Sequence, residues 1–133
     1  MEEHIINGEN ALLGRLCSYV AKQSLLGKNI VILNSKKVLI SGSKKNILKN
    51  YKEKRGRVGS SQKGPKISRL PVKILKRTIR GMLPHTQGRG KDALKRVMCY
   101  EEIPEKYKDK KAIFMKGKTK GKNINLGELC KLI

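Results

Sequence analysis

The sequence predicts an α/β fold: a single domain in which helices flank a mainly parallel sheet. In the first third of the chain, two short apolar runs enclose a longer segment with helical periodicity. Strand, helix and strand in this order are typical of a parallel pair with a right-handed crossover. The length of 133 residues suits one domain, and no internal repeat is evident.

The two strands of this unit are predicted over His4–Asn7 and Asn29–Leu33. The second run, NIVIL, is rich in β-branched residues, as expected for a strand covered on both faces. The intervening helix is expected over residues 12–25, with Asn10 as its N-terminal cap and Gly27 as the left-handed residue beyond its end. Its buried stripe follows the i, i+3, i+4 pattern and consists of Leu12, Leu13, Leu16, Cys17, Val20, Ala21, Ser24 and Leu25.

A short extended segment is expected over Val38–Ile40, and Ser41-Gly42-Ser43 opens a second helix that runs to about Lys54. Residues 55–66 (RGRVGSSQKGPK) contain six Gly, Ser or Pro and four Arg or Lys, with almost nothing to bury. This composition predicts a loop that its partner orders. A plain linker is the alternative, but the four cations favour contact with RNA.

A third helix is predicted over residues 71–83, with Pro71 in its first turn. Its expected buried stripe is Val72, Leu75, Ile79 and Met82, and its second face carries Lys73, Lys76, Arg77 and Arg80. Basic amphipathic helices also lie on membranes or bind calmodulin. The absence of bulky aromatic residues and the basic flanking loops favour phosphate binding.

After this helix, residues 85–91 (HTQGRGK) form a second predicted basic loop, and a short helix that begins near Gly88 ends at Lys95. The remaining predicted elements are a strand over Val97–Tyr100, an extended segment over Ala112–Met115 and a small helix over Leu126–Leu132. The single domain is thereby divided into a scaffold (1–54), basic loops with a helix (55–95), and a strand with a C-terminal extension (96–133).

Charge is the dominant feature of the composition: 32 Lys and Arg stand against 10 Asp and Glu, a formal net charge of +22. Residues 1–35 sum to zero, whereas residues 41–95 hold 17 basic and 2 acidic residues. A globule with such an imbalance repels itself unless a polyanion neutralises it. Nucleic acid is the expected polyanion, with an anionic membrane a distant second.

The residues that usually hold metals or catalyse reactions are sparse. Cys17, Cys99 and Cys130 show no CxxC spacing, and His4 and His85 are 81 positions apart, so we expect neither a metal site nor a disulfide framework. No nucleophile, base and orienting group converge at the sequence level, so we expect no enzyme, no cofactor and no small-molecule substrate. Scattered thiols, an acidic N-terminus and the lack of a long apolar run predict a soluble intracellular protein.

Gly8 and Gly14 lie between the first strand and the first helix, where dinucleotide-binding folds carry their fingerprint. The stretch NGENALLGR lacks both the GxGxxG and the P-loop spacing. We therefore expect Gly8 to make the turn and Gly14 to let the helix pack closely. A nucleotide-dependent enzyme and a DNA- or chromatin-binding module are the alternatives to RNA binding. The second is disfavoured because residues 71–83 contain no Asn or Gln to read bases.

Two segments resemble the L-thirteen family of large-subunit ribosomal proteins. The run LLGRLCSYVAKQSLLGKNIVILNSKKVLISG (12–42) is similar to the N-terminal half of that family, and RTIRGMLPHTQGRGKDALKRVMCYEEIP (77–104) is similar to its second signature around RGMLP. The histidine after MLP and the stretch IPEKYKDKK lean toward the eukaryotic branch. Eukaryotic members usually carry a longer basic tail, whereas this chain stops at Ile133.

The resemblance implies a non-catalytic structural role in the large ribosomal subunit, in subunit assembly and in translation. It also implies ribosomal RNA and neighbouring ribosomal proteins as partners, and a cytosolic ribosome as the location, with nucleolar assembly in a eukaryote. The family's matching region faces RNA, and the spacing of cations selects the candidate RNA-binding residues. These are Arg55, Arg57, Lys63, Lys66 and Arg69 from the first loop; Lys73, Lys76, Arg77 and Arg80 from the helix; and His85, Arg89 and Lys91 from the second loop.

Overall fold

The computed structural model describes residues 3–57, 68–115 and 121–133, and its centre is a parallel four-stranded sheet. The strands are β1 (Glu3–Asn7), β2 (Asn29–Leu33), β4 (Val97–Cys99) and β5 (Ile113–Phe114), in the order β4-β2-β1-β5. Strand β1 pairs in parallel with β2 and β5, and β2 pairs in parallel with β4. The predicted α/β class with a mainly parallel sheet in one domain is confirmed.

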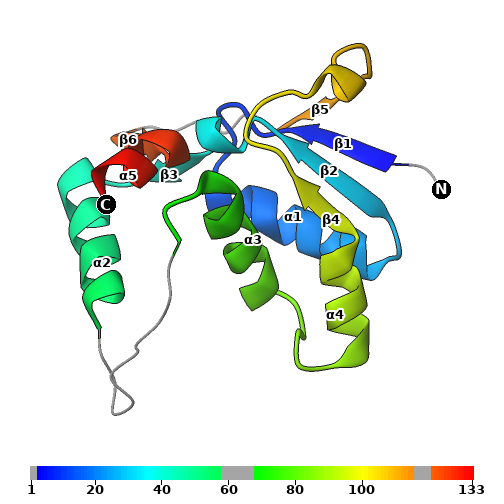
Figure 1. Cartoon of the computed structure of the whole chain (residues 1–133), viewed down its shortest axis with the longest axis horizontal. Coiled ribbons are helices and arrows are strands. Elements are labelled where there is room, and N and C mark those ends of the chain that lie inside the picture. The colour runs from blue at the N-terminus through cyan, green and yellow to red at the C-terminus, as the bar shows by residue number, and fades with distance from the viewer. Residues whose placement is uncertain (1–2, 58–67, 116–120) are drawn as a thin grey trace.

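Three helices cover one face of this sheet: α1 (Leu13–Leu25), α3 (Pro71–Gly81) and α4 (Gly88–Lys95) (Figure 1). Ile6, Ile30 and Ile32 of the sheet share a core with the helices and are fully buried. Each such side chain stabilises the fold by roughly 1.5–3 kcal/mol relative to exposure. The buried residues of α1 lie on the predicted stripe, although Leu25 at its end is exposed.

The opposite face of the sheet is covered by a segment without an α-helix. Ile5, Val31 and Leu33 pack against Tyr107, which lies in the short 3₁₀ turn η2 (Glu105–Tyr107). The rings of Tyr107 and Tyr100 lie 5.7 Å apart between centroids. Strand β2 is therefore buried on both faces, as its composition predicts.

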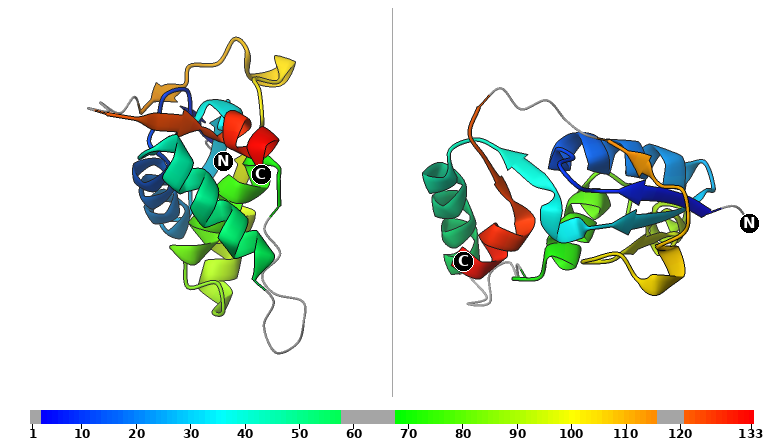
Figure 2. Two further views of the ribbon diagram at one scale, coloured as in Figure 1. Left: turned by 90° about the vertical axis from the view of Figure 1, so that its left-hand side faces the viewer. Right: turned by 90° about the horizontal axis from the view of Figure 1, so that it is seen from above.

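A smaller antiparallel pair extends the molecule at one end. Strand β3 (Leu39–Ser41) pairs with β6 (Asn123–Asn125), and β6 leads directly into α5 (Leu126–Leu132). Asn125 caps α5, since its side-chain oxygen accepts a hydrogen bond from the Glu128 amide at 2.8 Å. The views in Figure 2 show β3, β6 and α5 grouped beside the main sheet, next to the 3₁₀ turn η1 (Ser35–Lys37).

Helix α2 (Lys44–Gly56) projects from this end of the molecule (Figure 1). Ser43 caps it, as its hydroxyl accepts from the Asn46 amide at 3.2 Å. Only Ile47 of the helix is buried. A helix with so little apolar surface contributes little to the core, and its orientation depends on the elements that hold its first turn.

The loop before α1 differs from its prediction. Asn10 is not the N-terminal cap: it adopts a left-handed conformation (φ 58°), and the cap position is Leu12 without a side-chain hydrogen bond. The chain turns tightly here because the side chain of Asn7 accepts from the Glu9 amide at 3.0 Å. Gly27 has the predicted positive φ of 94°.

The roles of the two glycines of this region also differ from the prediction. Gly14 is exposed, and a Cβ there would meet nothing within 4 Å, so the expected close packing is wrong for it. Gly8 provides the close approach instead. Its amide donates to the Leu33 carbonyl at 2.8 Å, and a Cβ would lie 2.8 Å from Cγ2 of Val38.

Candidate nucleic-acid interface

Helix α3 presents cations outward because its apolar residues fix the opposite face. Leu75 and Ile79 are buried as predicted, but Ile74 and Leu83 complete the stripe in place of Val72 and Met82. The helix is thus rotated slightly from the expected orientation, which turns Val72 toward β4. Lys73, Arg77 and Arg80 are exposed and Lys76 is half-buried.

Two grooves flank this helix. The α3–β4 groove, of about 560 Å³, is lined by Ser68, Val72, Lys73, Lys76, Arg77, Arg80, Leu94, Met98 and Cys99. The α2–α3 cleft, of about 380 Å³, is lined by Tyr51, Lys54, Arg57, Ser68, Lys73, Ile74, Arg77 and Thr78. Lys73 and Arg77 belong to both linings, so they form the ridge between the two grooves.

We call the cations of these two grooves the basic face: Lys54, Arg57, Lys73, Lys76, Arg77 and Arg80. Neither lining includes an aspartate or glutamate among the residues that the structure describes. Five of the six cations are among the residues predicted from the sequence. A surface with one sign of charge and two grooves can neutralise closely spaced phosphates.

Lys54 is the cation of this face that sequence reasoning missed. It belongs to α2, and its Nζ lies 5.4 Å from the centroid of the Tyr51 ring. Burial is the main cause that raises the pKa of Tyr51 above its ordinary value. A signal is present in the composition, since residues 44–56 hold six Lys or Arg and one Glu. Such a helix is also typical of an ordinary solvated surface, and the predicted site begins only at residue 55.

Other predicted residues lie elsewhere. Arg69 lines a separate groove that also contains Glu101, Glu102 and Glu128, where the charges are mixed. Arg55 is not in the predicted loop: it lies in the last turn of α2 and is half-buried. The helix extends two residues beyond the expected end at Lys54, because Arg55 and Gly56 continue its regular turn. Lys63 and Lys66 lie outside the described residues.

The third predicted set lies at the junction of α3 and α4. His85, Arg89 and Lys91 are exposed and line neither groove of the basic face. Helix α4 begins at Gly88 as expected, so Arg89 and Lys91 are helical and the loop is confined to the residues before it. This set remains a predicted RNA contact, separate from the basic face.

The compactness of this junction depends on Gly90. A Cβ at this buried residue would lie 2.0 Å from the carbonyl oxygen and 2.3 Å from the carbonyl carbon of Pro84. No real Cβ contact is that short, so only glycine allows the turn after α3 to lie against the start of α4. The sequence shows the glycine but not this contact.

The three cysteines are free thiols, and burial is the main reason that their pKa values are high. The pKa of Cys17 is raised to about 12, with a smaller contribution from the neighbouring Cys99. The pKa of Cys99 is raised to about 11 although Lys76 acts in the opposite direction. Protonated thiols are poor nucleophiles and poor metal ligands at neutral pH.

The Cys17 thiol predicts a dependence of stability on alkaline pH. Below pH 9 the thiol is protonated in both states, and its contribution to stability is fully present. Between pH 9 and about 12 it ionises only when the chain unfolds, so the free energy of unfolding falls, by about 1.4 kcal/mol for each pH unit. Urea unfolding from pH 8 to 11 should show a steeper fall for the natural protein than for Cys17→Ala. Equal slopes would contradict the assignment.

Within the described residues there is no group of three His, Cys, Asp or Glu side chains that could hold a metal ion. Among the same residues, no helix is both long and apolar enough to cross a membrane.

Comparison with known proteins identifies the family. The family model described as "Ribosomal protein L13" matches residues 1–106. The chain belongs to this family. The protein named large ribosomal subunit protein uL13 of Methanosarcina barkeri is 44% identical over 131 residues, covering 94% of this chain and 93% of that protein. The uL13 protein of Methanocaldococcus jannaschii is also 44% identical, covering 96% and 94%.

The L13 match includes all of α2, α3 and α4, and with them every residue of the basic face. It also contains both segments on which the sequence resemblance rested. The uL13 protein of Caenorhabditis elegans is 43% identical over 112 residues, and the chain spans 55% of its length. Archaeal and eukaryotic members therefore match at similar identity, and the expected eukaryotic affinity stays a prediction.

Proposed function

We propose that this chain is a structural, non-enzymatic constituent of the large ribosomal subunit, which binds ribosomal RNA and supports subunit assembly and translation. Membership of the L13 family carries this proposal, and the relatives named above are large-subunit proteins. Its place is the cytosolic ribosome, and in a eukaryote it joins the subunit in the nucleolus. Its partners are ribosomal RNA and adjacent ribosomal proteins.

The basic face is the proposed principal RNA contact. Arginines such as Arg77 and Arg80 can hold a phosphate with two parallel hydrogen bonds, whereas Lys73 and Lys76 act as point charges. The two grooves lie on either side of one helix, so an irregular RNA can place backbone in both. His85, Arg89 and Lys91 extend the proposed contact to the end of α3. Arg55, Lys63 and Lys66 are also proposed RNA contacts, whereas Arg69 belongs to a surface of mixed charge.

Mixed charge marks a different kind of surface near the C-terminus. Arg69, Lys36 and Lys37 share one groove with Glu101, Glu102 and Glu128. Lys36 pairs with Glu102, and this pairing lowers the pKa of the glutamate. A surface with both signs of charge suits a neighbouring protein better than RNA.

Fractionation of a cell lysate on a sucrose gradient tests the function. The tagged full-length chain should sediment with large subunits and remain there after a wash at moderate salt. A nucleotide-dependent enzyme or a chromatin protein would instead remain at the top of the gradient or with DNA. Absence from large subunits would overturn the proposal.

A further inference from the structure

The α3–β4 groove differs from a simple phosphate-binding surface because its floor is apolar. Val72 and Leu94 are half-buried in it, and Met98 on β4 has 49% of its surface exposed. A phosphate gains nothing from these side chains and would lose hydration against them. The floor is therefore better suited to bind a flat or apolar group.

Strand β4 adds hydrogen-bonding groups to this floor. It is an edge strand of the sheet. On one side of Met98 the Ile30 amide donates to the Arg96 carbonyl, and on the other the Tyr100 amide donates to the Ile32 carbonyl. Backbone groups alternate along a strand, so those of Cys99, which lines the groove, point away from β2. One amide and one carbonyl at the same residue match the donor and acceptor edge of a nucleobase.

The charged residues that line the groove, which we call its rim, are all cations. Lys73, Lys76, Arg77 and Arg80 line it, and no carboxylate does so among the described residues. Its volume of about 560 Å³ falls within the range of roughly 300–1,000 Å³ of pockets that hold a small ligand. A nucleotide within an RNA chain has the matching chemistry, because its base has flat faces of low polarity and its ribose is linked to a phosphate on each side.

We propose that the α3–β4 groove receives one unpaired base of RNA, extruded from its helix. The base lies on Val72, Leu94 and Met98, and its flanking phosphates pair with the cations of the rim. An arginine of the rim can stack on the exposed face of the base. This inference rests on the proposed function and refines it, since it assigns to one groove a preference for bulged over fully paired RNA.

Two RNA hairpins test the proposal with the full-length chain. One carries a single 4-thiouridine bulge, and the other is identical but fully paired. The bulged hairpin should bind about fivefold to tenfold more tightly, a factor that corresponds to roughly 1–1.4 kcal/mol. Irradiation should cross-link the thiouridine to peptides that contain Val72 or Met98.

A matched pair of variants tests whether the preference for the bulged hairpin depends on the α3–β4 groove. Met98→Glu places a carboxylate on the floor and should abolish the preference for the bulge. Met82→Glu is the control, because Met82 has a similar exposed fraction of 43% and lies outside the groove. Met98→Ala, which adds no charge, should reduce the preference and shows whether apolar contact is responsible.

The outcomes separate the two proposals. Equal binding of both hairpins, with cross-links outside the groove, would overturn the base-binding inference and leave RNA binding intact. Failure to bind either hairpin would overturn both. Suppression of the cross-link by an acidic amphipathic peptide added before irradiation, with no preference for the bulge, would assign the groove to a protein partner and overturn the inference.

Discussion

Replacing Gly90 with alanine should destabilise the protein by about 3 kcal/mol or more, at the upper end of the usual cost of overpacking. The added Cβ would lie 2.0 Å from the Pro84 carbonyl oxygen, and the obstacle is backbone that no rotamer change can move. Helix α4 would have to shift away from the turn after α3. Because Ala93 of α4 and Val97 of β4 are fully buried, this shift would open the core.

Thermal unfolding measures this effect, and Gly88→Ala is its control. Gly88 is separated from Gly90 by one residue and begins the same helix, but a Cβ there would meet nothing within 4 Å. Gly88→Ala should leave the melting temperature unchanged or raise it slightly, because alanine favours a helix by up to about 1 kcal/mol. Gly90→Ala should lower it by about 10 °C or more. Similar melting temperatures for the two variants would refute the contact with Pro84.

Reversing the charge of Arg77 and Arg80 together should weaken binding to ribosomal RNA by about 100-fold at low salt, if each arginine that no longer holds a phosphate costs about tenfold. The dependence of log affinity on log salt should also become flatter, by about one unit for each phosphate that is no longer neutralised. The two residues lie on the outer side of α3 and line the same groove, so a single stretch of RNA can contact both. Filter binding over a series of salt concentrations measures both effects.

The control is the double reversal Lys22→Glu and Lys28→Glu. It changes the net charge by the same amount at two exposed lysines that do not line the grooves of the basic face. It should alter affinity only modestly, through the overall field. If the Arg77 and Arg80 variant, with an unchanged melting temperature, still sedimented fully with large subunits at raised salt, α3 would not be the RNA contact.

Local patterns were sufficient to predict most of the elements of the fold, but not β6. The periodicity of α1, the β-branched run of β2 and the glycine after α1 all depend on neighbouring residues, and each matches its prediction. The pairing of β3 with β6 was not predictable, because these strands are short and distant in sequence. The predicted cap at Asn10 is wrong because Asn10 adopts a left-handed conformation in the turn that the Asn7 side chain and the Glu9 amide form.

In the candidate site, too, local spacing predicted some residues, whereas others depend on contacts between distant segments. The cations of α3 follow from helical spacing, and the structure brings Arg57, Lys73 and Arg77 together as the prediction requires. Spacing could not show that Arg69 shares a groove with glutamates, since Glu101 and Glu128 come from distant segments. Helical spacing is equally consistent with a buried stripe that contains Val72 and with the neighbouring stripe that contains Ile74. For that reason Val72 was expected in the core. Whether these residues contact RNA stays a prediction.

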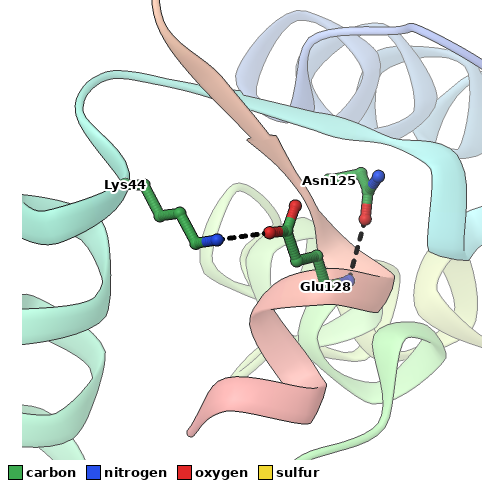
Figure 3. A network of polar contacts seen from close by, with 3 residues as sticks. All are labelled: Lys44, Asn125 and Glu128. Carbon is green, nitrogen blue, oxygen red and sulfur yellow. Dashed lines mark hydrogen bonds and ion pairs between the residues drawn. The ribbon is translucent and has the colours of Figure 1, made fainter.

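The connection between α2 and the C-terminal elements has a consequence for folding during synthesis. Lys44, in the first turn of α2, pairs with Glu128 of α5 at 2.6 Å, beside the cap made by Asn125 (Figure 3). Strand β3, which leads into α2, pairs along its length with β6, and Leu39 forms a single bridge with Leu12 before α1. The strand partner of β3 and the ion-pair partner of Lys44 are thus translated long after them. As the chain leaves the ribosome that makes it, α1 with β1 and β2 can assemble early, whereas α2 acquires its final orientation only after residues 123–128 have emerged.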